Sequence, residues 1–447
     1  MAKKQAIRFE CTNCGATYAA WSGRCSSCEQ WNTIEEQVNV TETLRSASAG
    51  LLAPKSLKEV IEHDTLKRIT TDIADVDTVL GGGLVPGGVT LIAGEPGIGK
   101  STLLLQIAAA VARKVSVLYV SGEESAHQVA LRAKRLGIHE NDLSVAVSAS
   151  ANNIAGAIAH GKYGLVIVDS IQTIGVDEIS SAYGTISQIT NSTQLLTAAA
   201  KRANSALVIV GHVTKEGSIA GPKVLEHTVD TVLQLEGDRY GGFKLLRAVK
   251  NRFGSTGETG IFEMKEQGLM PVANPSEALL AERQVSDGSV VHATIEGSRA
   301  LLVEIQALVN TTAYGYPKRA ASGFDIGRLN LLIAMIEKRT KLTLADKDVY
   351  INVVGGIKIT EPAADLAVVM AIASAAKGMQ LKKNAVVFGE LGLSGEVRHV
   401  PFIEKRIAEA DKLGFTTSIG PKTKGAHKSL SGVVSVRDAL NTFLEKE

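Results

Sequence analysis

The chain has 447 residues, 45% of them hydrophobic, which allows about two or three domains with sizeable cores. Its 48 basic and 46 acidic residues leave a formal net charge of +2, a balance that neither indicates nor excludes nucleic-acid binding. The longest apolar stretch, near residues 366–376, is much shorter than a membrane span, and no apolar run follows residues 1–6. We therefore expect a cytoplasmic protein with no signal peptide and no membrane association.

All four cysteines fall within residues 11–28, as two C-x-x-C pairs that are ten residues apart. This spacing predicts one tetrahedral Zn²⁺ site, ligated by Cys11, Cys14, Cys25 and Cys28. Two disulfides are the alternative, but a chain without an export signal favours a metal. A redox C-x-x-C is also disfavoured, because no βαβ pattern surrounds the cysteines.

The predicted zinc module spans residues 1–35 and is too small to have a core of its own. Gly15 and Gly23 supply tight turns beside the cysteines. We expect Trp21 and Trp31, the only tryptophans of the chain, to cover the metal site. Residues 36–55 are small and polar, which predicts a flexible linker.

Residues 94–101 fit the phosphate-binding pattern G-x-x-x-x-G-K-[ST]. An apolar run at residues 89–93 predicts a buried strand before this loop, and the Leu- and Ala-rich residues 102–114 predict a helix after it. A glycine-rich structural turn is the alternative, but strand, loop and helix are the context that the motif requires. The expected nucleotide-binding residues are Gly94, Glu95, Pro96, Gly97, Ile98, Gly99, Lys100, Ser101 and Thr102.

The geometry of such a loop explains its chemistry. Glycines let successive backbone N–H groups turn towards phosphate oxygens, and the helix N-terminus adds the positive end of its dipole. Lys100 would contact the β- and γ-phosphates, and the Ser101 hydroxyl would ligate Mg²⁺. The motif thus predicts a Mg²⁺-dependent nucleotide hydrolase.

Strands and helices alternate from residue 115 to residue 210, the pattern of a mostly parallel α/β sheet. We expect strands at residues 115–120, 143–147, 165–169 and 206–210. The third of these has four apolar residues followed by Asp169. This is a Walker B arrangement, which places the Asp169 carboxylate near the Mg²⁺ shell.

Polar side chains follow the ends of three of these strands. Since the carboxyl ends of parallel strands gather at the ligand crevice, we expect four residues to lie near the γ-phosphate: Glu123, Glu124, Asp169 and His212. One of the two glutamates is a candidate to orient and deprotonate the attacking water, although both could instead only begin the next helix. His212 could contact the γ-phosphate or have a structural role.

Four pieces of the chain together resemble the bacterial RadA family, also called Sms. They are the four-cysteine module, the glycine-rich residues 80–88 before the phosphate loop, the segment Lys-Asn-Arg-Phe-Gly at residues 250–254, and a tail similar to the Lon protease. The resemblance implies three parts: the zinc module, a RecA-like ATPase core at residues 56–280 with a mostly parallel sheet, and a Lon-protease-like α+β domain at residues 281–447.

The same resemblance implies an activity and partners. A member of this family would be a DNA-dependent ATPase that processes recombination intermediates in DNA repair, driving branch migration or strand unwinding. It would use ATP, Mg²⁺ and Zn²⁺, act with RecA on single-stranded and branched DNA, and form a homo-oligomer, expected to be a hexamer. The action on DNA, the partnership with RecA and the hexamer are implied by the resemblance alone and do not follow from composition or spacing.

Residues 281–447 depart from the Lon protease pattern at the catalytic positions. Active Lon proteases have their nucleophilic serine in a Gly-Pro-Ser-Ala-Gly run, and the matching run here has Ala363 in its place, which has no nucleophile. The partner lysine falls at Ile403, two residues before Lys405. We expect a scaffold for subunit assembly or for DNA, and not a protease. Scattered basic residues of this domain are more typical of a solvated face: Lys338, Arg339, Lys341, Lys382 and Lys383.

Residues 243–249 predict a strand that leads into Lys250 and Arg252. Side chains two apart on a strand lie on the same face, so these cations should project together, opposite Asn251 and Phe253. A solvated edge is one interpretation. The ring ATPases that this core resembles imply another, in which both cations complete the adjacent subunit's site and Arg252 acts as an arginine finger.

Three functions of different classes remain: a DNA-translocating ATPase, a signalling ATPase of the same core that acts on protein partners, and an ATP-gated protease. Ala363 argues against the protease. The signalling ATPase explains neither the cysteine module nor residues 250–254. Stimulation of ATP hydrolysis by single-stranded DNA would separate the first two functions.

Overall fold

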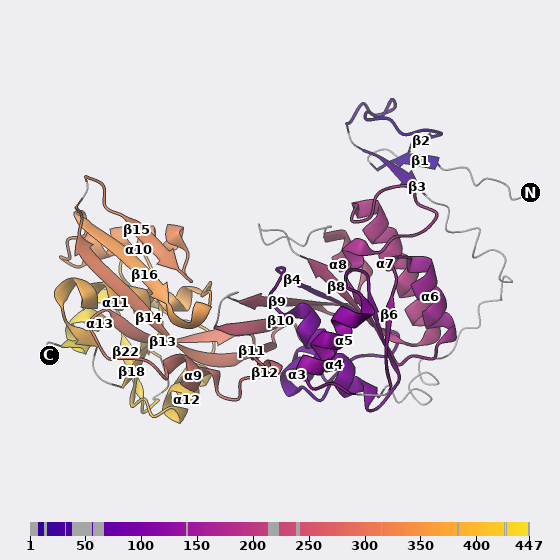
Figure 1. Ribbon diagram of the computed structural model, residues 1–447. Coiled ribbons are helices and arrows are strands. Elements are labelled where there is room, and N and C mark those ends of the chain that lie inside the picture. Colours follow the sequence, from indigo (N-terminus) through magenta and orange to yellow (C-terminus); the bar gives the residue numbers. More distant parts are fainter. Residues whose placement is uncertain are drawn as a thin grey trace, which may run out of the picture. The chain divides into compact units, whose positions relative to one another are not determined.

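Figure 1 shows the computed structural model, which describes residues 8–12, 16–31, 33–37, 56, 67–139, 142–212, 223–237, 242–313, 315–381, 384–423, 425 and 427–445. By their contacts the residues group into two compact units. One comprises Met1–Asp72, Gly83–Ala93 and Leu104–Val232, and the other Ile73–Gly82, Gly94–Leu103 and Leu233–Glu447. The domain bounds expected from the sequence remain predictions.

A small antiparallel sheet forms the N-terminal part of the first unit. Its central strand β1 (Arg8–Cys11) pairs with β2 (Thr17–Tyr18) on one side and β3 (Ile34–Gln37) on the other. Phe9, Tyr18 and Ile34 pack together with the cysteines. The predicted four-cysteine module is therefore a three-stranded ribbon with a minimal core.

The larger sheet of the first unit has the strand order β4-β8-β7-β5-β6, in which β6, β5, β7 and β8 pair in parallel. Every strand expected from an apolar run is present, and the run before Asp169 is completely buried. The bounds are β4 (Val89–Gly94), β5 (Val117–Ser121), β6 (Leu143–Val147), β7 (Leu165–Asp169) and β8 (Ala206–His212).

Helices pack against both faces of these strands (Figure 1). One face, made of alternate residues such as Leu118, Val166 and Leu207, packs against α6 and α7. The intervening Tyr119 and Ile167 are equally buried and point to the opposite face. Burial on both faces explains the continuous apolar runs of the sequence. The bounds are α4 (Lys100–Ala112), α5 (Ala126–Arg135), α6 (Ala151–His160), α7 (Ile186–Ala203), α8 (Lys223–Thr228) and the 3₁₀ turn η1 (Ile171–Thr173).

In the second unit, three strands form an antiparallel meander: β10 (Phe243–Asn251), β11 (Thr259–Lys265) and β12 (Gly268–Pro271). The short helix α3 (Ala74–Leu80) packs against β10 and β11. Strand β9 (Thr231–Gly237) begins in the first unit and ends in the second, and α9 (Pro275–Leu280) follows the meander.

A seven-stranded mixed sheet forms the C-terminal part, in the order β15-β16-β14-β13-β18-β21-β22. Helices α10, α11 and α13 cover one face, and α12 packs on the other face over β13 and β18. The larger elements are β13 (Ser289–Glu296), β14 (Arg299–Thr311), β15 (Arg319–Ser322), β16 (Lys347–Val353), β18 (Ala385–Val387), β21 (Thr417–Pro421), β22 (Leu430–Val433), α10 (Ile326–Arg339), α11 (Asp365–Lys377), α12 (Ile403–Lys412) and α13 (Val436–Phe443).

Short elements complete this part: β17 (Gln380–Leu381), β19 (Glu390–Leu391), β20 (Val397–Arg398), β23 (Leu444–Glu445) and the 3₁₀ turns η2 (Val354–Gly356) and η3 (Pro362–Ala364). The predicted fold class is confirmed. The chain has an N-terminal ribbon, an α/β core with mostly parallel strands, and a C-terminal part in which a mixed sheet carries helices on both faces.

Candidate nucleotide and metal sites

Three cysteines of the ribbon bring their thiols together. The sulfur atoms of Cys11, Cys25 and Cys28 all lie within 4.8 Å of one another, and those of Cys11 and Cys28 are 3.6 Å apart. That separation excludes a disulfide of about 2.05 Å. It fits the edge of a Zn–thiolate tetrahedron, about 3.8 Å for Zn–S bonds of about 2.3 Å. Cys14, the fourth expected ligand, lies outside the described residues.

The surroundings of Cys25 favour the thiolate that a metal needs. The Tyr18 hydroxyl lies 3.1 Å from the Cys25 sulfur, and its hydrogen bond is the main cause that lowers the pKa of the Cys25 thiol to about 6. The expectation for the tryptophans was wrong. Trp21 and Trp31 are 61% and 69% exposed, and Phe9, Tyr18 and Ile34 pack around the cysteines instead.

The phosphate loop connects β4 to α4. Gly97 and Gly99 have φ angles of +81° and +114°, which residues other than glycine rarely adopt. Lys100 is the first residue of α4 and is only 4% exposed. Its Nζ donates hydrogen bonds to the carbonyls of Gly94 at 2.8 Å and Glu95 at 3.0 Å. The lysine therefore lies inside the turn of the loop, and the first-turn N–H groups of α4 form an anion-binding terminus.

Asp169 is the last residue of β7 and lies opposite Ser121, the last residue of β5. The Tyr119 hydroxyl donates a 2.6 Å hydrogen bond to Asp169 Oδ2. Burial, followed by the charge of Asp169, raises the pKa of Tyr119 far above its usual value, so the phenol stays a donor. The Asp169 carboxylate is thus held by Tyr119 at the end of β7, and its role in binding Mg²⁺ stays a prediction.

The two glutamates after β5 have different partners. Glu123 accepts a hydrogen bond from the hydroxyl of Ser170, the residue after Asp169. Glu124 pairs instead with Arg132 of α5, with 2.6 Å between Oε1 and Nη2. Glu123 is therefore linked to the residue beside the Walker B carboxylate, whereas Glu124 is linked to a neighbouring helix.

Neither glutamate caps the following helix. Ser125 is the N-cap of α5, and its side chain forms a reciprocal capping box with Gln128. His212 is the last residue of β8, as expected, but its side chain lies outside the described residues. The structure therefore brings Glu123 into contact with Ser170, the residue after Asp169, and leaves the role of His212 a prediction.

The 250–254 segment begins inside β10 and leaves it. The strand ends at Asn251, so strand alternation does not fix the direction of Arg252. Lys250 is partly buried and Arg252 is exposed. Their expected projection on one face stays a prediction. The side-chain Nδ2 of Asn251 donates to the last carbonyls of α3, an anchoring that the sequence did not indicate.

The C-terminal sheet has no serine at the expected protease position. Ala363 lies buried in η3, and Ile403 is buried at the start of α12. The nearby Lys405 does not replace the lysine, because its Nζ donates a 2.9 Å hydrogen bond to the carbonyl of Ser298. The two positions that align with the Lon serine and lysine are thus occupied by buried apolar residues.

A buried ion pair, which the sequence did not indicate, occupies this region. Arg406 has no exposed surface, and its guanidinium binds the Glu361 carboxylate, with 2.9 Å from Nη1 to Oε1. The Nε2 atom of His292 lies 3.7 Å from the same carboxylate. Burial alone would raise the pKa of Glu361, but Arg406 and His292 hold it well below its usual value. The helical spacing of Arg406 from Ile403, Ile407 and Ala410 could have indicated that Arg406 is buried, although not that Glu361 is its partner.

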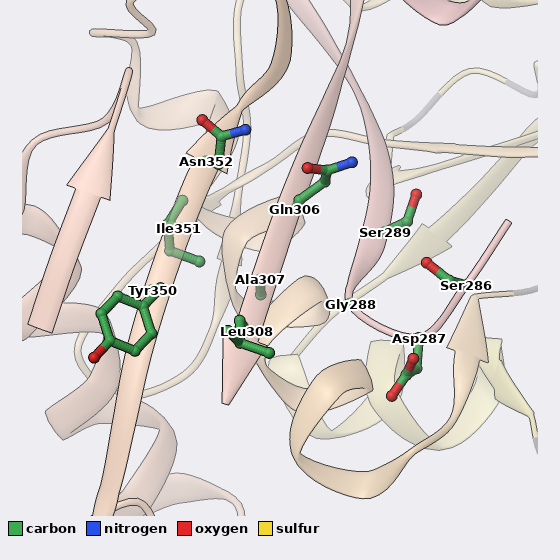
Figure 2. Close-up of a pocket in the computed structure, with 10 residues that line it drawn as sticks. All are labelled: Ser286, Asp287, Gly288, Ser289, Gln306, Ala307, Leu308, Tyr350, Ile351 and Asn352. Atoms are coloured by element: carbon green, nitrogen blue, oxygen red, sulfur yellow. The ribbon is translucent and has the colours of Figure 1, made fainter. Parts of the chain in front are cut away.

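A pocket of about 320 Å³, lined by both polar and apolar side chains, opens on the same sheet (Figure 2). Ser289, Gln306 and Asn352 lie opposite one another on the adjacent strands β13, β14 and β16. The Ser289 hydroxyl already donates to the buried Glu304 carboxylate.

Among the described residues, no helix combines the length and the apolar character needed to cross a bilayer. Three family models match parts of the chain. An AAA domain matches residues 57–218, a rubredoxin metal binding domain matches residues 9–36, and subunit ChlI of Mg-chelatase matches residues 330–424. The second match and the thiol cluster together confirm the predicted zinc ribbon.

Curated relatives match almost the whole chain. The DNA repair protein RadA of Halalkalibacterium halodurans is 46% identical over 99% of this chain and 100% of its own length. The proteins of the same name from Bacillus subtilis (47% identical, 99% and 100% covered) and Aquifex aeolicus (46%, 94% and 94%) are similar to the same extent. A solved RadB recombinase matches with 23% identity and a TM-score of 0.38, over 46% of this chain and 99% of its own.

Proposed function

This chain belongs to the RadA family of DNA repair proteins, and we propose that it is a DNA-dependent ATPase that drives branch migration or strand unwinding of recombination intermediates. The observation that carries the proposal is the phosphate loop between β4 and α4, with Lys100 inside its turn. The AAA domain match covers this loop, and the family match covers the whole chain.

We assign ATP and Mg²⁺ to this loop. The backbone N–H groups of the loop glycines and of the first turn of α4 would hold the phosphates. Lys100 would exchange its bonds to the loop carbonyls for bonds to the β- and γ-phosphates. Ser101 and Asp169 would hold the ion, which neutralises charge that develops on the transferred phosphoryl group. The donor set of one hydroxyl and one carboxylate fits a hard cation that prefers oxygen.

Glu123 is the residue that we assign to the attacking water. A general base must lie within hydrogen-bonding reach of the water proton, and Glu123 is bonded to Ser170, the neighbour of Asp169. Glu124 has its charge offset by Arg132. His212, at the end of the adjacent strand β8, would contact the γ-phosphate and report its presence.

We further propose that the active form is a homo-oligomeric ring, a hexamer, in which Lys250 and Arg252 complete the nucleotide site of the adjacent subunit. An arginine that contacts the γ-phosphate from a neighbour stabilises charge in the transition state. The C-terminal domain would support ring assembly or a DNA surface, and the protein would act with RecA on single-stranded and branched DNA. The family membership and the loss of the protease serine at Ala363 support these assignments.

The test is the ATPase rate of the purified protein with and without single-stranded DNA, together with its mass in solution with ATP bound. We expect DNA to increase the rate several-fold and the mass to be that of a hexamer. A rate that DNA leaves unchanged, while a protein partner increases it, would contradict this function in favour of a signalling ATPase.

A further inference from the structure

The turn between β13 and β14, residues 296–299, contacts the β10–β11 hairpin, beginning with Glu296 and Gly297. Glu296 is buried, with 5% of its surface exposed, and its carboxylate lies 2.7 Å from Nη2 of Arg247 in β10. Gly297 has a φ of +65°, and a Cβ there would lie only 2.2 Å from the carbonyl oxygen of Gly257. The turn and the hairpin loop therefore approach backbone to backbone, which only glycine allows.

The last two residues of the turn make further contacts on the same side. The Ser298 hydroxyl donates a hydrogen bond to the Glu258 carboxylate in the hairpin loop. Arg299 pairs with Asp75 in the first turn of α3, with 2.9 Å between Nη1 and Oδ1. Four successive residues of the C-terminal sheet thus hold β10, the loop that follows it, and α3.

Helix α3 in turn holds the 250–254 segment. The side-chain Nδ2 of Asn251 lies 3.3 Å from both the Val79 and the Leu80 carbonyl oxygens at the end of α3. Asn251 thus binds the C-terminal end of α3 in the way that a capping side chain does. Its Oδ1 accepts a 2.9 Å hydrogen bond from the backbone N–H of Phe253. Asn251, directly before Arg252, is therefore anchored to α3, and Phe253, directly after Arg252, is bonded to Asn251.

Two glycines allow this close packing at both ends of α3. A Cβ at Gly254 would lie 3.1 Å from the Cα of Gly81, directly after the helix. A Cβ at Gly260 would lie 3.1 Å from the Cβ of Asp75, in the first turn of the helix. The helix therefore connects the Asp75–Arg299 pair at one end with the Asn251 anchor at the other.

We propose that the turn at residues 296–299 is a positioning element for ATP hydrolysis, which holds the 250–254 segment in place through α3 and the hairpin loop. This inference rests on the proposed role of Arg252 in the neighbouring subunit's nucleotide site. The turn would let the C-terminal domain set the position of Arg252 without any contact to nucleotide. Such an element affects the rate of the chemical step, because Arg252 would contact charge that develops in the transition state.

The experiment reverses the charges of the Asp75–Arg299 pair. Arg299→Asp and Asp75→Arg should each lower kcat about tenfold, with the KM for ATP and nucleotide binding unchanged within about twofold, since a small misplacement of a catalytic contact costs rate. The double variant restores the pair and should regain most of kcat. Hydrogen exchange in a peptide that contains residues 250–254 should speed up in the single variants and slow again in the double variant.

Arg398→Asp is the matched control, because Arg398 is an exposed arginine of the same domain that pairs with Glu396 at 2.6 Å, outside the turn. It should leave kcat and hydrogen exchange at residues 250–254 unchanged. Single variants with normal kcat and exchange would overturn the inference, as would a double variant that regains neither. If exchange responds as stated but Arg252→Ala hydrolyses ATP at the wild-type rate, the proposed role of Arg252 fails while the mechanical link stands.

Discussion

At the scale of single residues, the two adjacent glutamates after β5 are chemically identical but differently bound. Glu123 is bonded to Ser170 beside Asp169, and Glu124 is paired with Arg132. Their order in the sequence could not distinguish them, because their partners lie in other parts of the chain. Ser170 follows β7, and Arg132 lies in α5. This difference in partners is the reason why we propose Glu123, and not Glu124, as the base.

We predict that Glu123→Gln lowers kcat by about 10²- to 10⁴-fold, the range for loss of a general base, while nucleotide binding is kept. Glu124→Gln is the matched control and should change kcat by less than about tenfold. Steady-state ATPase assays and equilibrium binding of a fluorescent ATP analogue would measure both. The opposite ranking of the two variants would show that Glu124 is the base.

A second residue-scale prediction concerns Glu296 and pH. Burial, only partly offset by Arg247, raises the pKa of the Glu296 carboxyl from 4.5 to about 7 in the folded protein. Between these two values the folded state keeps a proton that the unfolded state has lost, so folding stability falls as pH rises. Glu296→Gln removes this titration. The melting temperature of the wild type relative to the variant should therefore fall between about pH 4.5 and about pH 7. A difference that is constant or rises over this range would contradict the assignment.

At the scale of elements, the sequence predicted the parallel strands and the phosphate loop well, because each strand is a short apolar run between turn residues. It predicted the ribbon from cysteine spacing alone. It failed for Trp21 and Trp31, since a module of three short strands cannot bury two indoles and its core is filled by Phe9, Tyr18 and Ile34. Contacts between distant elements, such as Asn251 with α3, have no local pattern and could not be predicted.

The ribbon should depend on its metal for folding, since its apolar core is minimal and metal binding supplies the free energy of folding in such modules. A strong chelator or Cys25→Ala should therefore disorder residues 8–37 and leave the ATPase rate without DNA nearly unchanged. Limited proteolysis and elemental analysis would check this, with Ser26→Ala as a control in the same turn. Finding no zinc in protein that was purified without chelator would contradict the zinc site.

At the scale of the whole molecule, the C-terminal domain differs most from what its resemblance alone would imply. The positions that align with the Lon serine and lysine are Ala363 and Ile403, both buried, and the nearby charges belong to the Arg406–Glu361 pair. The sequence revealed the missing serine but not the ion pair, because Glu361 and Arg406 are 45 residues apart.

The domain should therefore not cleave peptides, because acyl transfer has no nucleophile at Ala363. A fluorophosphonate probe for reactive serines should leave the purified protein unlabelled, while an active Lon protease in the same assay is labelled. Stoichiometric labelling of a serine within residues 281–447 would contradict this prediction.

The central claim is that ATP bound at one subunit's phosphate loop is hydrolysed with the help of Arg252 from the next subunit. Lys100→Ala and Arg252→Ala should each abolish hydrolysis, the first by removing the phosphate contact and the second by removing the arginine finger. The most direct measurement mixes the two inactive variants under conditions of subunit exchange. A random equal mixture should regain about a quarter of the wild-type rate, because each active site then needs one subunit of each kind in a fixed order around the ring. A mixture that stays as inactive as either variant alone, with exchange demonstrated by labelled subunits, would contradict the account.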